Sequence, residues 1–411
     1  MKVELLNTGT ELLLGHVLNT HLQFLAKALF PLGLRIERQT TVPDGFAIRA
    51  ALEETFARAE IVLITGGLGP TTDDITREVV AELLGLPLEH DEEIMKAIAA
   101  RFASRKMKMS PRVGLQAQRP REATVLLNEF GTAPGLYLPA MSKPRASPHL
   151  FLLPGPPREL IPMFQEKVLP ILRTIAPATN FALRSYRIAG LGESIVEERV
   201  GEGLLALGVE LGYCARPGEV DVRVIGAPEL LDRAEALIIE KLGPALASKD
   251  GRPLEKVVVD LLTARGETIA TAESCTGGFL ANELTNVPGA SAVFVEGFVT
   301  YANAAKVRAL GVDAQLIEKY GAVSREVAEA MAEGARNAAD SDYALATTGI
   351  AGPSGGSNEK PVGTVFIALA SRNGSTIIER HRFATDRETF KSLAAQTALD
   401  LLRRNILASP R

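Results

Sequence analysis

The stretch TAESCTGG, residues 271–278, decides how the C-terminal part of the chain is interpreted. An apolar, β-branched run precedes it and the apolar-periodic segment FLANEL follows it, so the pattern predicts a strand that turns into a helix at Ser274. Unpaired N–H groups at a helix start favour negative charge, such as a phosphate or a tetrahedral oxyanion. Gly277 and Gly278 leave the backbone open to a ligand. The alternative is a capping serine followed by glycines that only make a tight turn.

A second stretch, GFVTYANAAK at residues 297–306, again reads as a strand that runs into a helix, and it places a lysine near the junction. A serine hydroxyl is a weak nucleophile without a base, and the C-terminal part of the chain contains one histidine, His381, on a strand-like run. Lys306 can serve instead, because desolvation lowers the pKa of a lysine far enough for its neutral amine to accept the serine proton. The alternatives are a solvated surface lysine at position 306 and Cys275 as the nucleophile.

Further motifs extend this pattern: VPGAS (287–291), GAVS (321–324), TGIAGPSGG (348–356) and KPVGTV (360–365). With the two stretches above, residues 254–408 resemble the CinA C-terminal family, which includes the nicotinamide mononucleotide amidohydrolases. The resemblance implies that Ser274 attacks the carboxamide, that Lys306 and Tyr301 assist proton transfer, and that ammonia leaves without help from a cofactor. The substrate-binding residues implied for this site are Glu273, Cys275, Thr276, Gly277, Gly278, Asn303, Thr348, Gly349, Gly352 and Arg387.

Four of these residues also have a local interpretation. The glycine-rich loop that contains Thr348, Gly349 and Gly352 follows a short apolar strand, and such a loop either cradles a phosphate or is merely flexible. Arg387 lies in the first turn of the last helix, behind Asp386 as its N-cap. Its guanidinium is either a phosphate ligand or a surface charge.

The whole chain has 411 residues, enough for two or three domains, with 46% hydrophobic and 23% charged residues. No apolar run reaches the roughly 18 residues needed to cross a bilayer, and the N-terminus lacks the pattern of a signal peptide. We therefore expect a cytoplasmic protein without membrane association. Cys214 and Cys275 form neither a disulfide framework nor a zinc site. A net charge of −4 gives no basic footprint for nucleic acid, so small nucleotides are the expected ligands.

Residues 1–175 alternate strands and helices, which predicts a doubly wound, parallel α/β sheet. The third strand delivers GGLGPTTDDIT, residues 66–76, into a helix. In a purely structural interpretation the glycines make a turn, Thr72 caps the helix, and Asp73 and Asp74 complement its dipole. In a functional interpretation the glycines let N–H groups approach a phosphate, while the two aspartates hold a divalent metal ion such as Mg²⁺.

The strings TGTELLLGHVLNT (8–20), VPDG (42–45) and PGPPREL (154–160), taken with the glycine–aspartate loop, resemble the CinA N-terminal domain, which is similar to molybdopterin-binding domains. The implied activity is metal-dependent hydrolysis of ADP-ribose to AMP and ribose 5-phosphate, with Asp73 and Asp74 as metal ligands. Thr10 departs from the family, which usually has an aspartate before Glu11. The nucleotide-binding residues implied for this domain are Glu11, Asn19, Asp44, Gly66, Gly67, Gly69, Pro70, Thr71 and Thr76.

Residues 182–247 read as strand, helix, two strands and helix, a small α+β module that resembles the KH-like middle domain of full-length CinA proteins. Because it lacks a basic stripe and an aromatic platform for RNA, a spacer or dimerisation element is the favoured interpretation. The predicted domains are 1–175, 176–250 and 251–411, in a homodimer that binds small nucleotides. The non-enzymatic alternative is a nucleotide-sensing or scaffold protein linked to DNA uptake or damage responses.

Overall fold

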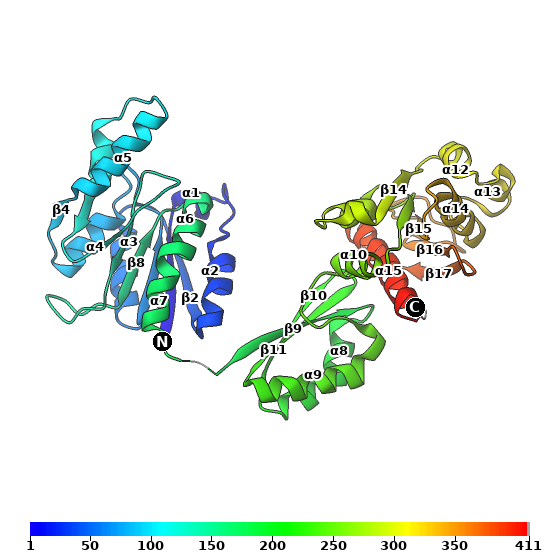
Figure 1. The fold of residues 1–411 in the computed structure, drawn as a ribbon, viewed down its shortest axis with the longest axis horizontal. Helices are drawn as coiled ribbons and strands as arrows, with labels where there is room; N and C mark the ends of the chain where they lie inside the picture. The colour runs from blue at the N-terminus through cyan, green and yellow to red at the C-terminus, as the bar shows by residue number, and fades with distance from the viewer. Residues whose placement is uncertain (179, 409–411) are drawn as a thin grey trace. The chain divides into compact units, whose positions relative to one another are not determined.

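The computed structural model describes residues 1–178 and 180–408 (Figure 1). The chain divides into two compact units, with the boundary between residues 179 and 180. Each unit has its own sheets and its own clusters of buried hydrophobic side chains. Within the described residues, no helix combines the length and the apolar character needed to cross a membrane.

The first unit is built on a six-stranded sheet in which four neighbouring strands run parallel and two edge strands are antiparallel. The central strand β3 (Ile61–Thr65) is buried along its whole length because helices cover both faces of the sheet, as is typical of parallel sheets. In sheet order the strands are β2 (Arg35–Val42), β1 (Lys2–Thr8), β3 (Ile61–Thr65), β8 (His149–Leu153), β7 (Gly135–Leu138) and β6 (Thr124–Leu126).

One hydrophobic cluster on this sheet contains residues of α3 and α4, and a second contains residues of α2, α6 and α7. The helices therefore cover opposite faces, which confirms the doubly wound α/β fold. Residues outside the main sheet include the short β4–β5 ladder and α5. The remaining elements are α1 (Thr10–Leu13), α2 (His21–Leu29), α3 (Ala47–Phe56), α4 (Thr76–Leu84), β4 (Leu88–His90), α5 (Glu92–Ser104), β5 (Gln118–Pro120), α6 (Pro157–Met163) and α7 (Leu169–Ile175).

The second unit begins with a small α+β module whose four-stranded sheet is antiparallel, in the order β10-β11-β9-β12. A hydrophobic cluster joins its two helices to the sheet. The order of elements confirms the expectation of a KH-like module. Its elements are β9 (Ala182–Ala189), α8 (Glu193–Leu205), β10 (Glu210–Arg216), β11 (Glu219–Gly226), α9 (Pro228–Leu242) and β12 (Leu246–Ser248).

This module packs against the C-terminal domain through a buried arginine. Arg403 is 1% exposed, donates hydrogen bonds to the carbonyl oxygens of Pro244 (2.6 Å) and Leu246 (3.3 Å), and pairs with Asp400 at 2.7 Å. Such a buried guanidinium is tolerated because each of these acceptors replaces water. The two modules therefore share one compact unit. The boundaries at residues 175 and 250 stay predictions.

The C-terminal domain is an α/β layer structure on a five-stranded sheet, in which β14, β13 and β15 are parallel and β16 and β17 are antiparallel. In sheet order the strands are β14 (Phe294–Val299), β13 (Ile269–Glu273), β15 (Tyr343–Gly349), β16 (Thr364–Ser371) and β17 (Ile377–Arg382). The helices are α10 (Leu254–Arg265), α11 (Phe279–Thr285), α12 (Asn303–Leu310), α13 (Ala314–Tyr320), α14 (Arg325–Ala338) and α15 (Arg387–Ala408).

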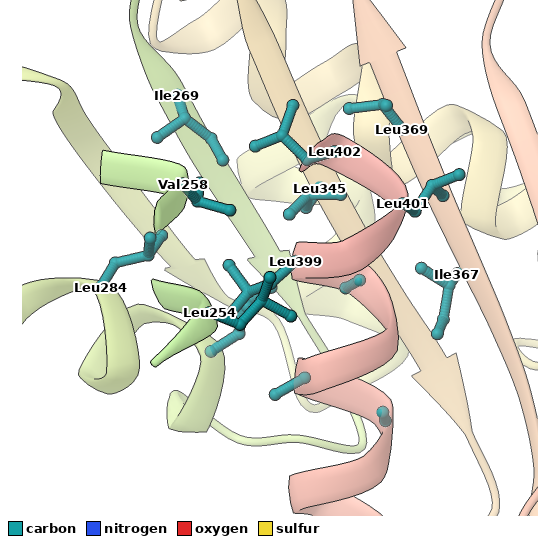
Figure 2. Packing of buried hydrophobic residues seen from close by; sticks show 14 of the residues in the cluster. Leu254, Val258, Ile269, Leu284, Leu345, Ile367, Leu369, Leu399, Leu401 and Leu402 are labelled. Atoms are coloured by element: carbon teal, nitrogen blue, oxygen red, sulfur yellow. The ribbon is translucent and has the colours of Figure 1, made fainter. Parts of the chain in front are cut away.

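The two faces of this sheet carry different side chains. On one face, leucines of α15 and α10 pack against Ile269, Leu345 and Ile367 (Figure 2). On the other face, alanines of β13 and β15 pack against alanines of α14. Ser324 caps α14, because its hydroxyl accepts a hydrogen bond from the Val327 N–H at 3.3 Å. The alternation of side chains along β13 assigns each residue of that strand to one face or the other.

Replacing Leu402 by alanine should lower the free energy of unfolding by about 2–5 kcal/mol, because its side chain is completely buried beneath the sheet. Leu407, on the same helix, is 58% exposed, and its replacement by alanine should change stability by less than about 0.5 kcal/mol. Urea denaturation of the full chain, followed by circular dichroism, measures both. Equal shifts for the two variants would contradict the packing of α15.

Candidate functional site

The turn that follows β13 carries Ser274 at the carboxyl end of a central parallel strand, the edge where α/β sheets hold their ligands. The strand ends at Glu273 and α11 begins at Phe279, which confirms the predicted strand–turn–helix order. Gly277 and Gly278 have φ values of 62° and 94°, a left-handed conformation that favours glycine. Their role in shaping the turn is therefore independent of any ligand.

Lys306 lies on α12 and is 1% exposed, so its ammonium group reaches the site from inside the protein. Its Nζ atom is 3.0 Å from Ser274 Oγ, 2.7 Å from the carbonyl oxygen of Thr300 and 3.3 Å from that of Tyr301. These acceptors all come from the β13 and β14 ends, which the sheet brings together. The solvated surface lysine is thus excluded as an interpretation of Lys306.

The surroundings of Lys306 favour its neutral form. Burial lowers the pKa of the Lys306 ammonium, because desolvation disfavours the charged form. As a neutral amine, Lys306 can donate its two N–H groups to the carbonyls of Thr300 and Tyr301. Its lone pair then faces Ser274 Oγ and can accept the hydroxyl proton. The geometry is that of a nucleophile and its base.

Cys275 is 5% exposed, and burial raises the pKa of its thiol to about 12. Because the thiolate is the reactive form of cysteine, a thiol with this pKa is almost entirely protonated near neutral pH. Cys275 therefore lines the site as a small apolar side chain, and the structure favours Ser274 as the nucleophile.

Tyr301 and Arg387 form the outer wall of the same site. Arg387, in the first turn of α15, donates hydrogen bonds to Tyr301 Oη at 2.9 Å and to the carbonyl oxygen of Gly352 at 3.0 Å. The N-cap expected just before it is confirmed, since Asp386 accepts hydrogen bonds from the N–H groups of Glu388 and Thr389, both at 3.0 Å. Arg387 is therefore a held cation at the site, and the phenol proton of Tyr301 stays free to donate.

These side chains surround a cavity of about 210 Å³, large enough to hold several water molecules. Most residues predicted from the sequence line it. Ala322, Val323 and Ala351 line it as well and were not predicted, although they lie within the quoted motifs, because small apolar residues carry no chemical signal. The predicted residues in its wall are Ser274, Cys275, Tyr301, Asn303, Lys306, Thr348, Gly349 and Arg387.

The structure places Glu273 and Thr276 elsewhere, which corrects their prediction as substrate ligands. Glu273 is 0% exposed, and its carboxylate accepts hydrogen bonds from the first N–H groups of α11. The hydroxyl of Thr276 is 2.7 Å from that of Thr347 in the protein interior. The start of α11 is consequently not a free anion site, and Ser274 is not its cap. Gly277, Gly278 and Gly352 also lie outside the lining of the cavity.

The first unit holds a second cavity, of about 390 Å³, at the carboxyl ends of β1, β3 and β8. Its predicted lining residues are Glu11, Asp44, Gly66, Gly67, Gly69, Pro70, Thr71, Asp73 and Asp74. Two predicted residues do not line it. Thr76 is completely buried and donates a hydrogen bond to the Gly66 carbonyl at 3.1 Å, while Asn19 accepts one from the His21 N–H at 3.1 Å.

The glycines of this cavity are required by close packing. A Cβ atom on Gly66 would lie 2.4 Å from the carbonyl oxygen of Thr8, and one on Gly67 would lie 2.0 Å from Thr76 Oγ1. A Cβ atom on Gly69 would lie 2.4 Å from a carboxylate oxygen of Asp74. In the glycine loop the backbone therefore packs directly against side chains, independently of any ligand.

The carboxylates of the second cavity are held separately. Asp44 Oδ2 accepts hydrogen bonds from the N–H (2.9 Å) and hydroxyl (3.2 Å) of Thr10, so the residue that departs from the family pattern orients this aspartate. Asp74 Oδ2 accepts a hydrogen bond from the Thr71 N–H at 3.0 Å, which closes the loop. Within residues 1–178 and 180–408, no group of three or more His, Cys, Asp or Glu side chains is placed to hold a metal ion.

The interpretation in which Thr72 caps α4, part of the purely structural alternative, is wrong. The helix begins at Thr76 and the residue before it, Ile75, has no side-chain capping bond, so Thr72 lies outside the helix. Gln116 lines the cavity but was not predicted. It is 1% exposed and donates a hydrogen bond to the Leu68 carbonyl at 3.2 Å, from a 3₁₀ segment distant in sequence from the loop. Only the tertiary fold brings it there.

Comparison with protein families gives three matches along the chain. The models match residues 4–174 to a “Probable molybdopterin binding domain”, residues 183–243 to the “Damage-inducible protein CinA KH domain”, and residues 251–406 to the “CinA C-terminal domain”. The first match lies in the first unit. The second and third matches lie in the second unit and correspond to the small α+β module and the C-terminal domain.

Several relatives are similar over the full length. A CinA-like protein of Akkermansia muciniphila is 45% identical over 97% of this chain and 96% of its own, and one of Kosmotoga olearia is 40% identical over 99% of both. The solved structure of the competence/damage inducible protein CihA from Agrobacterium tumefaciens is 44% identical, covering 37% of this chain and 93% of its own, with a TM-score of 0.36.

The reactivity of Ser274 should depend on the protonation of Lys306. Modification by a sulfonyl fluoride, followed by intact mass spectrometry, should accelerate as pH rises and level off below the ordinary lysine value of 10.5, because burial lowers the pKa of Lys306. Below the midpoint the amine is protonated and has no lone pair for the serine proton.

Lys306→Met should lower this labelling rate by about 10²- to 10⁴-fold, the usual cost of losing a general base. The matched control is Lys319→Met, because Lys319 is an exposed lysine on α13 and should leave the rate unchanged. A wild-type pH profile in the Lys306→Met variant would show that another group activates Ser274.

Proposed function

Because this chain belongs to the CinA family, and because Lys306 holds its amine against Ser274, we propose that its C-terminal domain hydrolyses the carboxamide of nicotinamide mononucleotide. The products are nicotinate mononucleotide and ammonia. The observation that carries the proposal is the 3.0 Å contact between Lys306 Nζ and Ser274 Oγ at the wall of a cavity.

The reaction follows from the proton positions available to these two residues. Lys306 takes the hydroxyl proton as Ser274 Oγ attacks the carboxamide carbon, which gives a tetrahedral oxyanion. The proton then passes to the amide nitrogen, the C–N bond breaks, and ammonia leaves an ester on Ser274. Water, activated by the same amine, attacks the ester and releases the carboxylate and the free serine. Every proton is returned, so no cofactor is consumed.

Other residues of the cavity wall supply the remaining functions. The phenol oxygen of Tyr301 already accepts a hydrogen bond from Arg387 at 2.9 Å, so its O–H can donate a hydrogen bond to the leaving nitrogen while Lys306 supplies the proton. The guanidinium of Arg387 provides a cation for the 5′-phosphate, the one part of the substrate with full negative charge. Asn303 and the loop from Thr348 complete the pocket.

Ser274→Ala should abolish ammonia release from nicotinamide mononucleotide, whereas Cys275→Ala should retain most of it. The first change removes the nucleophile, and the second removes a protonated thiol that only lines the pocket. Ammonia release by purified full-length protein, with circular dichroism to verify folding, measures both. Turnover that is lost in Cys275→Ala and kept in Ser274→Ala would reverse the assignment. Binding without turnover in the wild type would favour a nucleotide sensor or scaffold.

We further propose that the N-terminal cavity hydrolyses ADP-ribose to AMP and ribose 5-phosphate. The cavity brings Glu11, Asp44, Asp73 and Asp74 to the edge of the sheet that also carries the glycine loop. Mg²⁺ commonly binds one or two carboxylates together with substrate phosphates and water. The described residues contain no group of three or more such ligands, and this is compatible with an ion that the protein shares with the pyrophosphate. When bound, this ion would neutralise phosphate charge, with Asp73 and Asp74 as its protein ligands.

The two activities should separate by their metal requirement. EDTA should stop AMP formation from ADP-ribose and leave ammonia release from nicotinamide mononucleotide unchanged, because the serine–lysine site uses no cation. Asp73→Asn should lower AMP formation by at least about 10-fold at subsaturating Mg²⁺, with ammonia release in the same sample as the internal control. AMP formation that persists in EDTA, or that is absent with every divalent ion tried, would refute this second activity.

A further inference from the structure

The carboxylate of Glu273 is completely buried, a position in which an unpaired charge would be very costly. Its Oε2 atom accepts hydrogen bonds from the N–H groups of Gly278 and Leu280, both at 3.0 Å, and Oε1 accepts one from Ala281 at 2.8 Å. These groups open α11, whose positive dipole end also favours the negative charge. One carboxylate thus satisfies the start of the helix that follows the nucleophile.

This contact determines which N–H groups remain for a ligand. The donors at the start of α11 are occupied, and the Ser274 N–H donates to the Thr347 carbonyl at 2.9 Å. Within the described residues, the N–H groups of Cys275, Thr276 and Gly277 donate to no backbone carbonyl. In hydrolases with a nucleophile at a strand–helix turn, the residue after the nucleophile supplies an oxyanion donor. Cys275 has that position here.

Glu273 is also connected to the base. Its own carbonyl oxygen accepts a hydrogen bond from the Thr300 N–H at 2.8 Å, and the Thr300 carbonyl in turn accepts one from Lys306 Nζ at 2.7 Å. The alternation of β13 directs Glu273 toward α11 on one face and the next residue, Ser274, toward Lys306. The residue therefore lies between the turn that holds the nucleophile and the strand end that holds the base.

We propose that Glu273 is a positioning residue for the serine–lysine site, and that by occupying the start of α11 it leaves the N–H group of Cys275, which lines the cavity, to bind the oxyanion. The inference rests on the proposed amide hydrolysis and names the part of the protein that stabilises its tetrahedral intermediate. Glu273 does not touch the substrate, since its carboxylate is enclosed by α11.

The test uses the full-length chain with Glu273→Gln and Glu273→Asp. Glutamine keeps the size of the side chain but presents an NH₂ group to backbone donors, and aspartate keeps the charge but is one CH₂ shorter. Two rates are measured for each variant: modification of Ser274 by a sulfonyl fluoride, and ammonia release from nicotinamide mononucleotide. Glu273→Gln should lower kcat and the labelling rate by about 10²- to 10³-fold, the cost of a lost oxyanion donor, with KM changed by less than about threefold. Glu273→Asp should fall between it and the wild type.

The matched control is Glu219→Gln in the small α+β module, which removes another buried carboxylate, 5% exposed and paired with Arg187 at 2.7 Å. It should lower the melting temperature and leave both rates unchanged. A general loss of stability would instead affect the control and the Glu273 variants alike. If Glu273→Gln does not fold, the Glu273→Asp comparison decides.

The outcomes separate this inference from the proposed function. Wild-type kcat and labelling rates in folded Glu273 variants would overturn the inference, as would a change confined to KM. A wild-type protein that is labelled at Ser274 but releases no ammonia would refute the substrate assignment. In that case a slow labelling rate in Glu273→Gln would still support the positioning role.

Discussion

The C-terminal site depends on a buried lysine, Lys306, which has no carboxylate partner among the residues that the structure describes. Desolvation disfavours its ammonium form, and the acceptors that compensate it are two backbone carbonyls and the Ser274 hydroxyl. Those carbonyls belong to the end of β14, so Lys306 can be held only if β13 and β14 stay paired in parallel. The Lys306 amine is kept away from water and next to the Ser274 hydroxyl by the sheet, the alanine-packed helices and the turn after β13.

Both cavities are built at the carboxyl ends of parallel strands, yet they use their glycine loops differently. In the first unit, Gly66 and Gly67 lie where a Cβ atom would collide with Thr8 or Thr76, so the glycines allow backbone to pack on side chains. After β13, Gly277 and Gly278 supply left-handed conformations, and a carboxylate fills the helix start. A glycine-rich loop before a helix is therefore not by itself a phosphate site.

Much of this arrangement could be predicted from the sequence, because strand–turn–helix order and motif spacing are local properties. Both junctions that carry Ser274 and Lys306 were confirmed, and the family was identified from its motifs. The prediction of Glu273 as a substrate ligand did not consider which face of the sheet its side chain points to. The alternation of side chains along β13 contains that information. The contact of Arg387 with Tyr301, and the position of Gln116, join segments far apart in the chain and required the tertiary structure.

In the proposed mechanism, Ser274 Oγ carries the acyl group between the two halves of the reaction. Rapid acid quenching during turnover of nicotinamide mononucleotide, followed by peptide mass spectrometry, measures this directly. The predicted result is an ester on Ser274 whose mass equals the substrate minus ammonia, and its diversion by hydroxylamine to the hydroxamate. An adduct on Cys275, or steady formation of nicotinate mononucleotide with no hydroxamate in the presence of hydroxylamine, would contradict the serine–lysine mechanism.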